Sequence, residues 1–409
     1  MTTYANGFRN PLMIAAAVLL LQSGAFGQAP AAGQPGVPQA GQPGRGAARG
    51  AAQPQIVSPG VLPDRRVVFR LRAPQAQNVA IRGEMATAAP GAPGGGRGPG
   101  GSQLTKDSSG VWQVTLGPIN PGAYRYTFVV DGLQVVDPSN TAVSLSNTTV
   151  QSLLYVPGAD FMDARDVPHG AISTVYYPSS TVHALRRMHV YTPPGYEAGQ
   201  QKYPLFFLLH GAGDSDDSWP TIGRAGFILD NLIASKKAKP MVVAMPYGHT
   251  NSQTAPATAT RPPGATDEFL NDFWNDLRPF AENTYRILPG RENRAIAGLS
   301  MGGGHTLSIA LPHLEGFAYI GVFSSGLYQV KMAEWEKEHP EVDNAAWRKG
   351  LKLFWFATGS DDPLMSSTQE TMDMLKRHGF NLVFKRTGGA HTWINWREYL
   401  NEFAPMIFR

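Results

Sequence analysis

The sequence predicts two folded regions: a β-sandwich, then a larger region in which helices flank a mostly parallel β-sheet. Three observations support this prediction. Short segments that alternate apolar and polar residues occupy 56–158, as in a sandwich. Beyond residue 171, continuous apolar segments alternate with helical ones, which indicates a parallel sheet buried on both faces. In that second region, a Gly-x-Ser-x-Gly motif joins a predicted strand directly to a predicted helix.

The first 55 residues precede both folded regions. An apolar run from Leu12 to Leu21 follows Arg9 and ends in small residues, with a suitable cleavage site after Gly27. This pattern predicts a signal peptide over 1–27; the alternative is an uncleaved membrane anchor. Between Gln28 and Pro54, 24 of 27 residues are Gly, Ala, Pro or Gln, so 28–55 is expected to be a disordered tether. We therefore expect an exported protein, periplasmic or extracellular, with no membrane contact after cleavage.

Composition excludes several classes of function. The 409 residues carry a formal net charge of +4, with scattered basic residues and no cysteine. Scattered charge argues against a nucleic-acid partner. The lack of cysteine excludes disulfides, a thiolate nucleophile and cysteine metal sites. The sequence shows no metal-ligand cluster or nucleotide loop, so we expect no metal and no cofactor.

The region 56–158 is predicted to contain at least four strands separated by turns, with a Gly/Pro-rich insert at Ala86–Gly101. The predicted strands are Val67–Arg72, Asn78–Arg82, Val111–Leu116 and Tyr124–Val130. With the segments Val67–Pro74, Lys106–Trp112, Pro121–Gly132 and Asp137–Pro138, the region resembles the immunoglobulin-like early-set modules related to carbohydrate-binding module family 48. The resemblance implies the fold more firmly than a ligand. Trp112, Tyr124 and Tyr126 would stack on sugars if exposed, but alternating strand positions favour the core.

Residues 159–170 are predicted to be a linker, and 171–409 the second folded region. Its strands are expected at Arg187–Thr192, Pro204–His210, Pro240–Pro246, Asn293–Leu299, Phe317–Phe323, Leu351–Ala357 and Asn381–Lys385. Helices are expected at Glu268–Arg286, Met301–Leu311 and Ser366–His378. This alternation, together with the serine motif, predicts an α/β-hydrolase fold.

Ser300 lies in the Gly-x-Ser-x-Gly motif, where a sharp turn between strand and helix exposes a serine hydroxyl as a nucleophile. A serine needs a base, and the base needs an acid, in the chain order Ser, Asp or Glu, His. His391 follows a predicted strand and begins the last helix, which is the usual place of the base. Asp361 and Asp362 both follow the preceding strand, and spacing does not separate them.

The reaction also needs amide donors for the negative charge that develops on the acyl oxygen. One is expected from Met301, directly after the nucleophile. The other is expected from the loop after the strand Pro204–His210, at Ala212 or at Gly211. His210 precedes the nucleophile in the chain, so we interpret it as structural.

Several further motifs carry a family resemblance: Tyr191–Tyr196, His210-Gly211, Ser218-Trp219, Arg294–Gly303, Val322–Gly326, Gly359–Asp362 and Gly388–Trp396. With them, 171–409 resembles the esterase D-like proteins, which include feruloyl and acetylxylan esterases of carbohydrate esterase family 1, enterochelin esterases, S-formylglutathione hydrolases and mycolyltransferases. The resemblance implies Asp362 as the acid and the amides of Ala212 and Met301 as the oxyanion donors. Within these motifs we expect Trp219 and Trp393 to bind substrate.

This layout resembles that of secreted plant-cell-wall esterases. We expect a serine esterase that removes feruloyl or acetyl groups from xylan-type polysaccharide and also acts on small esters. A siderophore esterase of the enterochelin type is the first alternative, and a non-catalytic carbohydrate-binding protein the second. Every predicted triad and oxyanion residue lies after Thr192, so we expect the second region to hydrolyse small esters without the sandwich.

Overall fold

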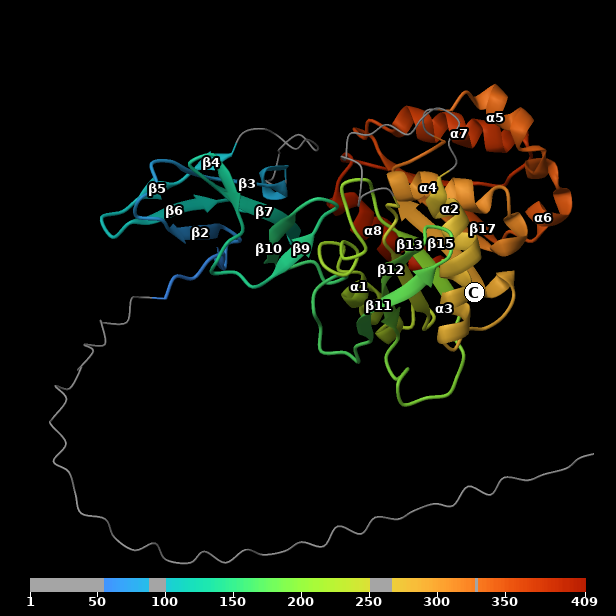
Figure 1. Ribbon diagram of the computed structural model, residues 1–409, viewed down its shortest axis with the longest axis horizontal. Helices are drawn as coiled ribbons and strands as arrows, with labels where there is room; N and C mark the ends of the chain where they lie inside the picture. Colours follow the sequence, from blue (N-terminus) through green and yellow to red (C-terminus); the bar gives the residue numbers. More distant parts are fainter. Residues whose placement is uncertain (1–54, 88–100, 251–266, 328–329) are drawn as a thin grey trace, which may run out of the picture. The chain divides into compact units, whose positions relative to one another are not determined.

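The computed structural model describes residues 55–87, 101–250, 267–327 and 330–409 (Figure 1). The predicted signal peptide, all but the last residue of the predicted tether and most of the Gly/Pro-rich insert lie outside these ranges. Among the described residues, no helix combines the length and the apolar character that crossing a membrane requires.

Two antiparallel sheets form the sandwich. The first has the strand order β1-β2-β6-β5, and the second has the order β4-β3-β7-β10-β9, with β8 paired to β7. Their bounds are β1 Gly60–Val61, β2 Val67–Arg72, β3 Val79–Gly83, β4 Ser102–Gln103, β5 Thr105–Lys106, β6 Val111–Leu116, β7 Gly122–Val130, β8 Leu133–Val135, β9 Val143–Leu145 and β10 Val150–Val156.

A common core joins the two sheets, because alternate residues of each strand point inward. Phe69 on β2 meets Tyr126 on β7 edge to face, with ring centroids 5.0 Å apart. Trp112, Tyr124 and Tyr126 all belong to this core. Their exposed fractions are 7%, 2% and 0%, so these three rings are packing residues rather than a platform for sugars.

The second region is built on one eight-stranded sheet in the order β11-β12-β14-β13-β15-β16-β17-β18. Strands β14, β13, β15, β16, β17 and β18 run parallel to one another. Strands β11 and β12 are antiparallel to each other, and β12 is also antiparallel to β14. The bounds are β11 Ala171–Ser179, β12 Ala184–Thr192, β13 Leu205–Leu209, β14 Val242–Pro246, β15 Arg294–Leu299, β16 Tyr319–Phe323, β17 Leu353–Gly359 and β18 Val383–Thr387.

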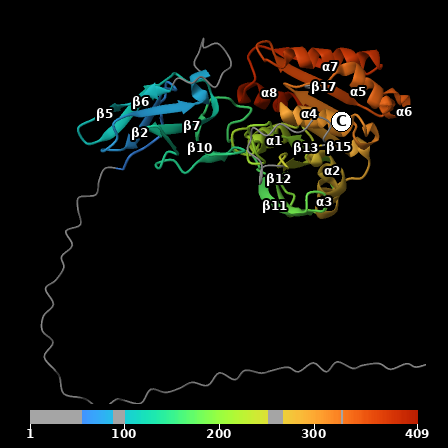
Figure 2. The same ribbon diagram turned by 45° about the horizontal axis from the view of Figure 1, so that its top comes forward.

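Helices cover both faces of this sheet, as the continuous apolar strands require. In β13, Phe207 belongs to a core on one face that includes residues of α2, α3, α4 and α7. Phe206 belongs to a second core, on the other face, that includes residues of α1 and α8. In both views α4 lies beside β13 and β15 (Figures 1 and 2). The helices are α1 Ala225–Ala234, α2 Glu268–Asp272, α3 Arg278–Thr284, α4 Met301–Ala310, α5 Met332–Glu338, α6 Ala345–Lys349, α7 Met365–Arg377 and α8 Trp393–Phe403. The predicted α/β-hydrolase fold is confirmed, and the two antiparallel sheets that precede it are consistent with the predicted β-sandwich.

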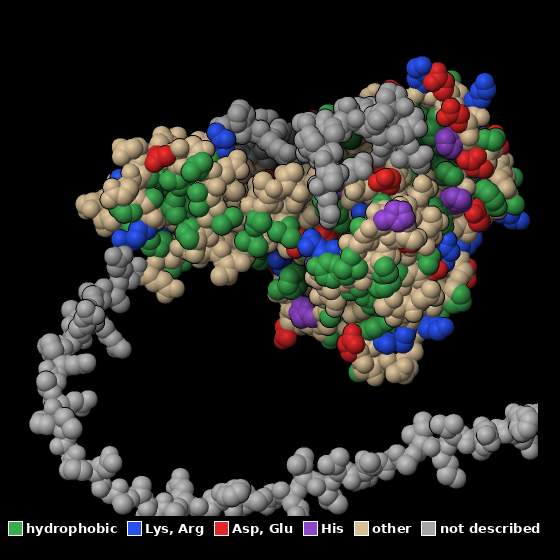
Figure 3. Space-filling view, in the orientation of Figure 1, with side chains coloured by type: hydrophobic (Ala, Val, Ile, Leu, Met, Phe, Trp, Pro, Cys, Tyr) green, Lys and Arg blue, Asp and Glu red, His purple; other side chains and the backbone are tan. Residues whose placement is uncertain are grey.

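The parallel strands direct four loops to one edge of the sheet. The segments that carry Gly211, Ser300, Asp362 and His391 follow β13, β15, β17 and β18, so all four begin at the carboxyl ends of their strands, where α/β proteins place their sites. On the face shown in Figure 3, acidic and basic side chains are interspersed over the second folded region as a whole.

Candidate active site

Ser300 sits in a strained turn between β15 and α4. Its φ and ψ are 53° and −119°, a conformation that few residues with a side chain adopt. The turn is tight: a Cβ added to Gly298 would lie 2.3 Å from the carbonyl oxygen of Gly302, and one added to Gly302 would lie 2.5 Å from that of His210. The glycines on both sides of the serine are therefore required by the close approach of backbones.

The structure brings Ser300, His391 and Asp362 together. The Ser300 Oγ lies 2.8 Å from Nε2 of His391. The Nδ1 of the same ring lies 3.0 Å and 3.1 Å from the two carboxylate oxygens of Asp362. The Asp362 side chain is fully buried, whereas that of His391 is 26% exposed. This is the geometry in which a carboxylate orients an imidazole that can take the serine proton.

The two carboxylates that compete for His391 in the sequence have different surroundings. Asp361 is exposed, and its Oδ1 accepts a hydrogen bond from its neighbour Ser360. Asp362 also accepts a hydrogen bond from the amide of Leu364. Burial alone would raise the pKa of Asp362, but the hydrogen bond and charge of His391 outweigh it and hold that pKa below its ordinary value. Asp362 is therefore a charged partner for His391.

Two backbone amides belong to segments that adjoin the nucleophile: Met301 directly follows Ser300, and Ala212 follows Gly211, where an added Cβ would lie 3.4 Å from the Ser300 Cβ. Met301 is the first residue of α4, so its amide has no acceptor within the helix. Ala212 is exposed within a turn that runs from Gly211 to Asp214, closed by a 3.1 Å hydrogen bond from the Asp214 amide to the Gly211 carbonyl. Among the described residues, the Ala212 amide donates to no other backbone group. Both amides have the character expected of oxyanion donors.

His210 holds the peptide that precedes Ala212. The amide of Gly248 donates to its Nε2 at 2.9 Å, so the ring proton is on Nδ1, which lies 2.8 Å from the Gly211 carbonyl oxygen. Because a trans peptide directs its C=O and N–H to opposite sides, fixing this carbonyl also orients the Ala212 N–H. Burial lowers the pKa of His210 to about 4, which keeps the ring neutral. The sequence predicts only a structural role for His210. Its position directly before Gly211, the first residue of the turn, is the one sequence feature that points to its role in orienting the Ala212 amide.

Trp219 and Trp393 are core residues, which corrects the expectation that they bind substrate. They are 1% and 5% exposed and pack edge to face with ring centroids 5.0 Å apart. Trp219 also donates its indole N–H to the Leu209 carbonyl. A different indole adjoins the triad: the Trp396 ring lies edge to face with His391 at 4.9 Å.

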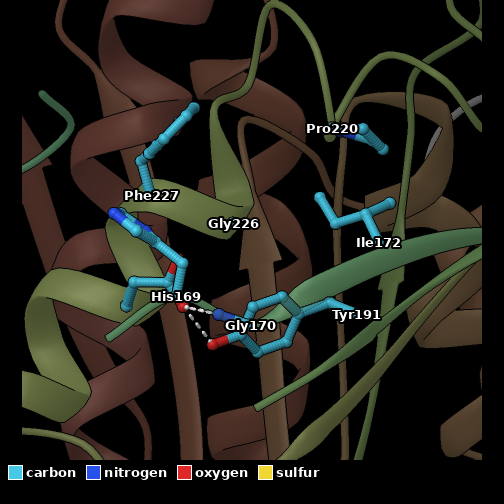
Figure 4. A pocket seen from close by; sticks show the side chains of 8 residues that line it. His169, Gly170, Ile172, Tyr191, Pro220, Gly226 and Phe227 are labelled. Atoms are coloured by element: carbon cyan, nitrogen blue, oxygen red, sulfur yellow. Dashed lines mark hydrogen bonds and ion pairs between the residues drawn. The ribbon is translucent and has the colours of Figure 1, made fainter. Parts of the chain in front are cut away.

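A cavity of about 310 Å³ lies elsewhere in this region, lined by His169, Gly170, Ile172, Tyr191, Pro220, Gly226, Phe227 and Asp230 (Figure 4). One oxygen of Asp230 accepts hydrogen bonds from the Gly170 amide and the Tyr191 hydroxyl, and the other faces His169 at 2.8 Å. The carboxylate is thus fully engaged in joining the segment before β11 to α1. The cavity contains none of the triad residues.

Comparison with known proteins decides the family. The model of the family named Esterase matches residues 179–407, which is more than half of the chain. The chain belongs to this family. As an esterase, it is a carboxylic ester hydrolase, and the part of the chain that matches contains Ser300, Asp362 and His391.

Among relatives of this esterase, the endo-1,4-β-xylanase/feruloyl esterase of Xylanibacter ruminicola is 32% identical over 350 residues, which cover 83% of this chain and 44% of the relative. The chain therefore spans less than half the length of that protein. A ferulic acid esterase structure is 25% identical, with a TM-score of 0.50, over 58% of this chain and 97% of its own.

The structure of the enterobactin esterase from Shigella flexneri in the presence of enterobactin has the same fold, with 17% identity and a TM-score of 0.57 over 83% of this chain and 92% of its own. Residues 171–409 make up less than two thirds of the chain. The similarity to this structure and to the Xylanibacter protein therefore extends into the sandwich.

Proposed function

We propose that this esterase uses Ser300 as the nucleophile of an acyl-enzyme mechanism. The observation that carries the proposal is the unbroken set of contacts from Ser300 Oγ through His391 to the buried Asp362. Ser300 Oγ would attack the ester carbonyl carbon while its proton passes to Nε2 of His391. The negative charge on the former carbonyl oxygen would be met by the amides of Ala212 and Met301.

The remaining steps use the same groups. Collapse of the tetrahedral intermediate breaks the bond to the alcohol, which leaves with the proton held by His391. Water then loses a proton to His391 and attacks the acyl-enzyme, which releases the acid and restores Ser300. Asp362 supports the cationic ring in both halves, because its charge favours imidazolium.

For the substrate, we propose feruloyl or acetyl esters on xylan-type plant polysaccharide. The 32% identity to a protein described as an endo-1,4-β-xylanase/feruloyl esterase supports this class. The alternative is a siderophore ester, which the fold shared with an enterobactin esterase fits. A non-catalytic carbohydrate-binding protein is disfavoured by the assembled triad.

Initial rates on methyl ferulate, acetylated xylan and enterobactin distinguish these substrates. We expect the highest kcat/KM on one of the two plant-type esters, and a preference for enterobactin would favour the siderophore alternative. Labelling with a fluorophosphonate tests the mechanism, since the wild-type protein should be labelled at Ser300 and Ser300→Ala should be unlabelled and inactive. Inactivity of the wild-type protein on every ester would favour the carbohydrate-binding alternative.

For location, we propose export to the periplasm or beyond, on the strength of Arg9 and the apolar run from Leu12 to Leu21. Mass spectrometry of the N-terminus of the mature protein tests this. A new terminus at Gln28 is expected, and a membrane-bound protein that retains residues 1–27 would favour the anchor.

A further inference from the structure

The sandwich inserts an arginine into the region that carries the triad. Arg125, on β7, has a side chain that is only 3% exposed. Its Nη1 donates to Oδ1 of Asp214 at 2.7 Å, and its Nη2 donates to Oγ of Ser218 at 2.7 Å. Its Nε donates to Oγ of Ser144 on β9, within the sandwich, at 3.1 Å. The guanidinium therefore connects the two folded regions through buried, directional contacts.

Asp214 is the last residue of the oxyanion turn. Its amide closes the turn by donating to Gly211, while its side chain, 7% exposed, faces Arg125. A buried carboxylate is costly unless a cation and hydrogen bonds compensate it. The position of Asp214, and with it the end of the turn that carries Ala212, therefore depends on a residue of the sandwich.

The sandwich holds the same turn at a second point. The amide of Asn147 donates to the carbonyl of Gly213 at 3.3 Å. The Asn147 side chain accepts a hydrogen bond from the hydroxyl of Tyr247 at 2.7 Å. Ala212 and Gly213 are themselves exposed, so the tip of the turn has little packing of its own to fix it. Contacts at its ends must supply that rigidity.

We propose that Arg125 is a positioning residue for ester hydrolysis: through Asp214 it fixes the turn whose Ala212 amide stabilises the oxyanion. The sandwich is then part of the catalytic apparatus rather than a separable module. This inference rests on the proposed Ser300 mechanism. It replaces the expectation that residues 171–409 hydrolyse small esters without the sandwich, because Arg125 contacts Asp214.

The test uses Arg125→Gln in the full-length protein, assayed with 4-nitrophenyl acetate. Misplacing an oxyanion donor affects the transition state more than the bound ester, so kcat should fall about 10- to 100-fold, less than the roughly 10²–10³-fold that removal of a donor costs. KM should change by less than about threefold, since ground-state binding does not use the donor. Affinity for a boronic acid that forms a tetrahedral adduct with Ser300 should fall in parallel with kcat.

Arg294→Gln is the matched control. Arg294 also forms a mostly buried ion pair, with Glu282 at 2.6 Å, but it begins β15, at the opposite end from Ser300. Its loss should lower the Tm and leave kcat unchanged at a temperature where the protein is folded. Asp214→Asn should mimic Arg125→Gln, and the double variant should cost no more than about the worse single one, because the two residues act as a unit.

A folded Arg125→Gln protein with wild-type kcat and boronate affinity would overturn the proposal. If that variant does not fold, Arg125→Lys replaces it, because one ammonium cannot reproduce the two-pronged contact; wild-type kcat in folded Arg125→Lys would overturn the proposal equally. Ser300→Ala is assayed alongside. If Ser300→Ala remains active, the mechanism itself fails; if it is inactive and Arg125→Gln is unaffected, only the role of Arg125 fails.

Discussion

Asp361 and Asp362 are adjacent in the chain, yet only Asp362 is buried against His391. We expect Asp362→Asn to lower kcat by about 10³- to 10⁴-fold, because an amide cannot stabilise the imidazolium or hold the required tautomer. Asp361→Asn is the matched control and should cost much less. Steady-state kinetics on 4-nitrophenyl acetate measure both. A larger loss at Asp361 would transfer the role of the acid to that residue.

A second residue-scale prediction concerns His210 and acid stability. The folded-state pKa of His210 is about 4, against an ordinary value of 6.5. Between these two pH values the unfolded chain binds more protons, so the stability due to the neutral ring is complete above pH 6.5 and is lost as the pH falls through about 4. The loss reaches about 3 kcal/mol in the unfolding free energy.

Urea titrations between pH 4 and 7 measure this loss, with His210→Asn as the comparison. The variant should show a shallower dependence on pH, since its side chain does not titrate. Nearby groups contribute as well: the His249 ring lies 5.3 Å away, and burial lowers its pKa too, whereas Asp214 and Asp216 act to raise the pKa of His210. His249→Asn separates the two histidines. An unchanged slope in His210→Asn would contradict the prediction.

Among elements, the turn between β15 and α4 depends most on glycine. In Gly298→Ala, the new methyl group would have to displace the Gly302 carbonyl, 2.3 Å away. We expect a destabilisation of about 1–3 kcal/mol and a lower kcat, because the shift moves Ser300. Gly60→Ala in the sandwich is the control, since its nearest neighbour would lie at 3.8 Å. Thermal melts and steady-state kinetics measure the Tm and kcat of both variants. If Gly298→Ala has the same Tm and kcat as Gly60→Ala, the turn tolerates a side chain and the prediction is wrong.

The central strands of the sheet were predictable because they are continuous apolar segments buried on both faces, as in β13 and β15. The edge strand β11 was missed, because most of its residues are exposed and its pattern is weak. Strands β9 and β10 were also missed, although β10 alternates buried and partly buried residues. At the site, Ser300 was predictable from the Gly-x-Ser-x-Gly motif, and His391 from its position between a predicted strand and the last helix. The Arg125–Asp214 contact spans 89 residues, and no local pattern reports such a pairing.

At the scale of the molecule, Gln55–Arg409 forms one compact unit. Ala123 of the sandwich packs in the core beneath α1 and α8, and its carbonyl accepts a hydrogen bond from Arg397, a fully buried residue on α8. We therefore expect a single cooperative transition in calorimetry, with equal calorimetric and van't Hoff enthalpies. Two separate transitions would show that the sandwich and the esterase domain unfold independently.

The burial of Arg125 and Asp214 also bears on the solutions in which the enzyme can work. Dissolved ions weaken attractions between charges that face water, but they screen buried pairs much less. Concentrated salt would weaken an interface held by exposed ion pairs. The Arg125 and Asp214 side chains are only 3% and 7% exposed, so dissolved counterions have little access to this pair. The attachment of the sandwich to the oxyanion turn should therefore be insensitive to ionic strength, and the enzyme should keep its turnover rate on a neutral ester from dilute buffer to concentrated salt.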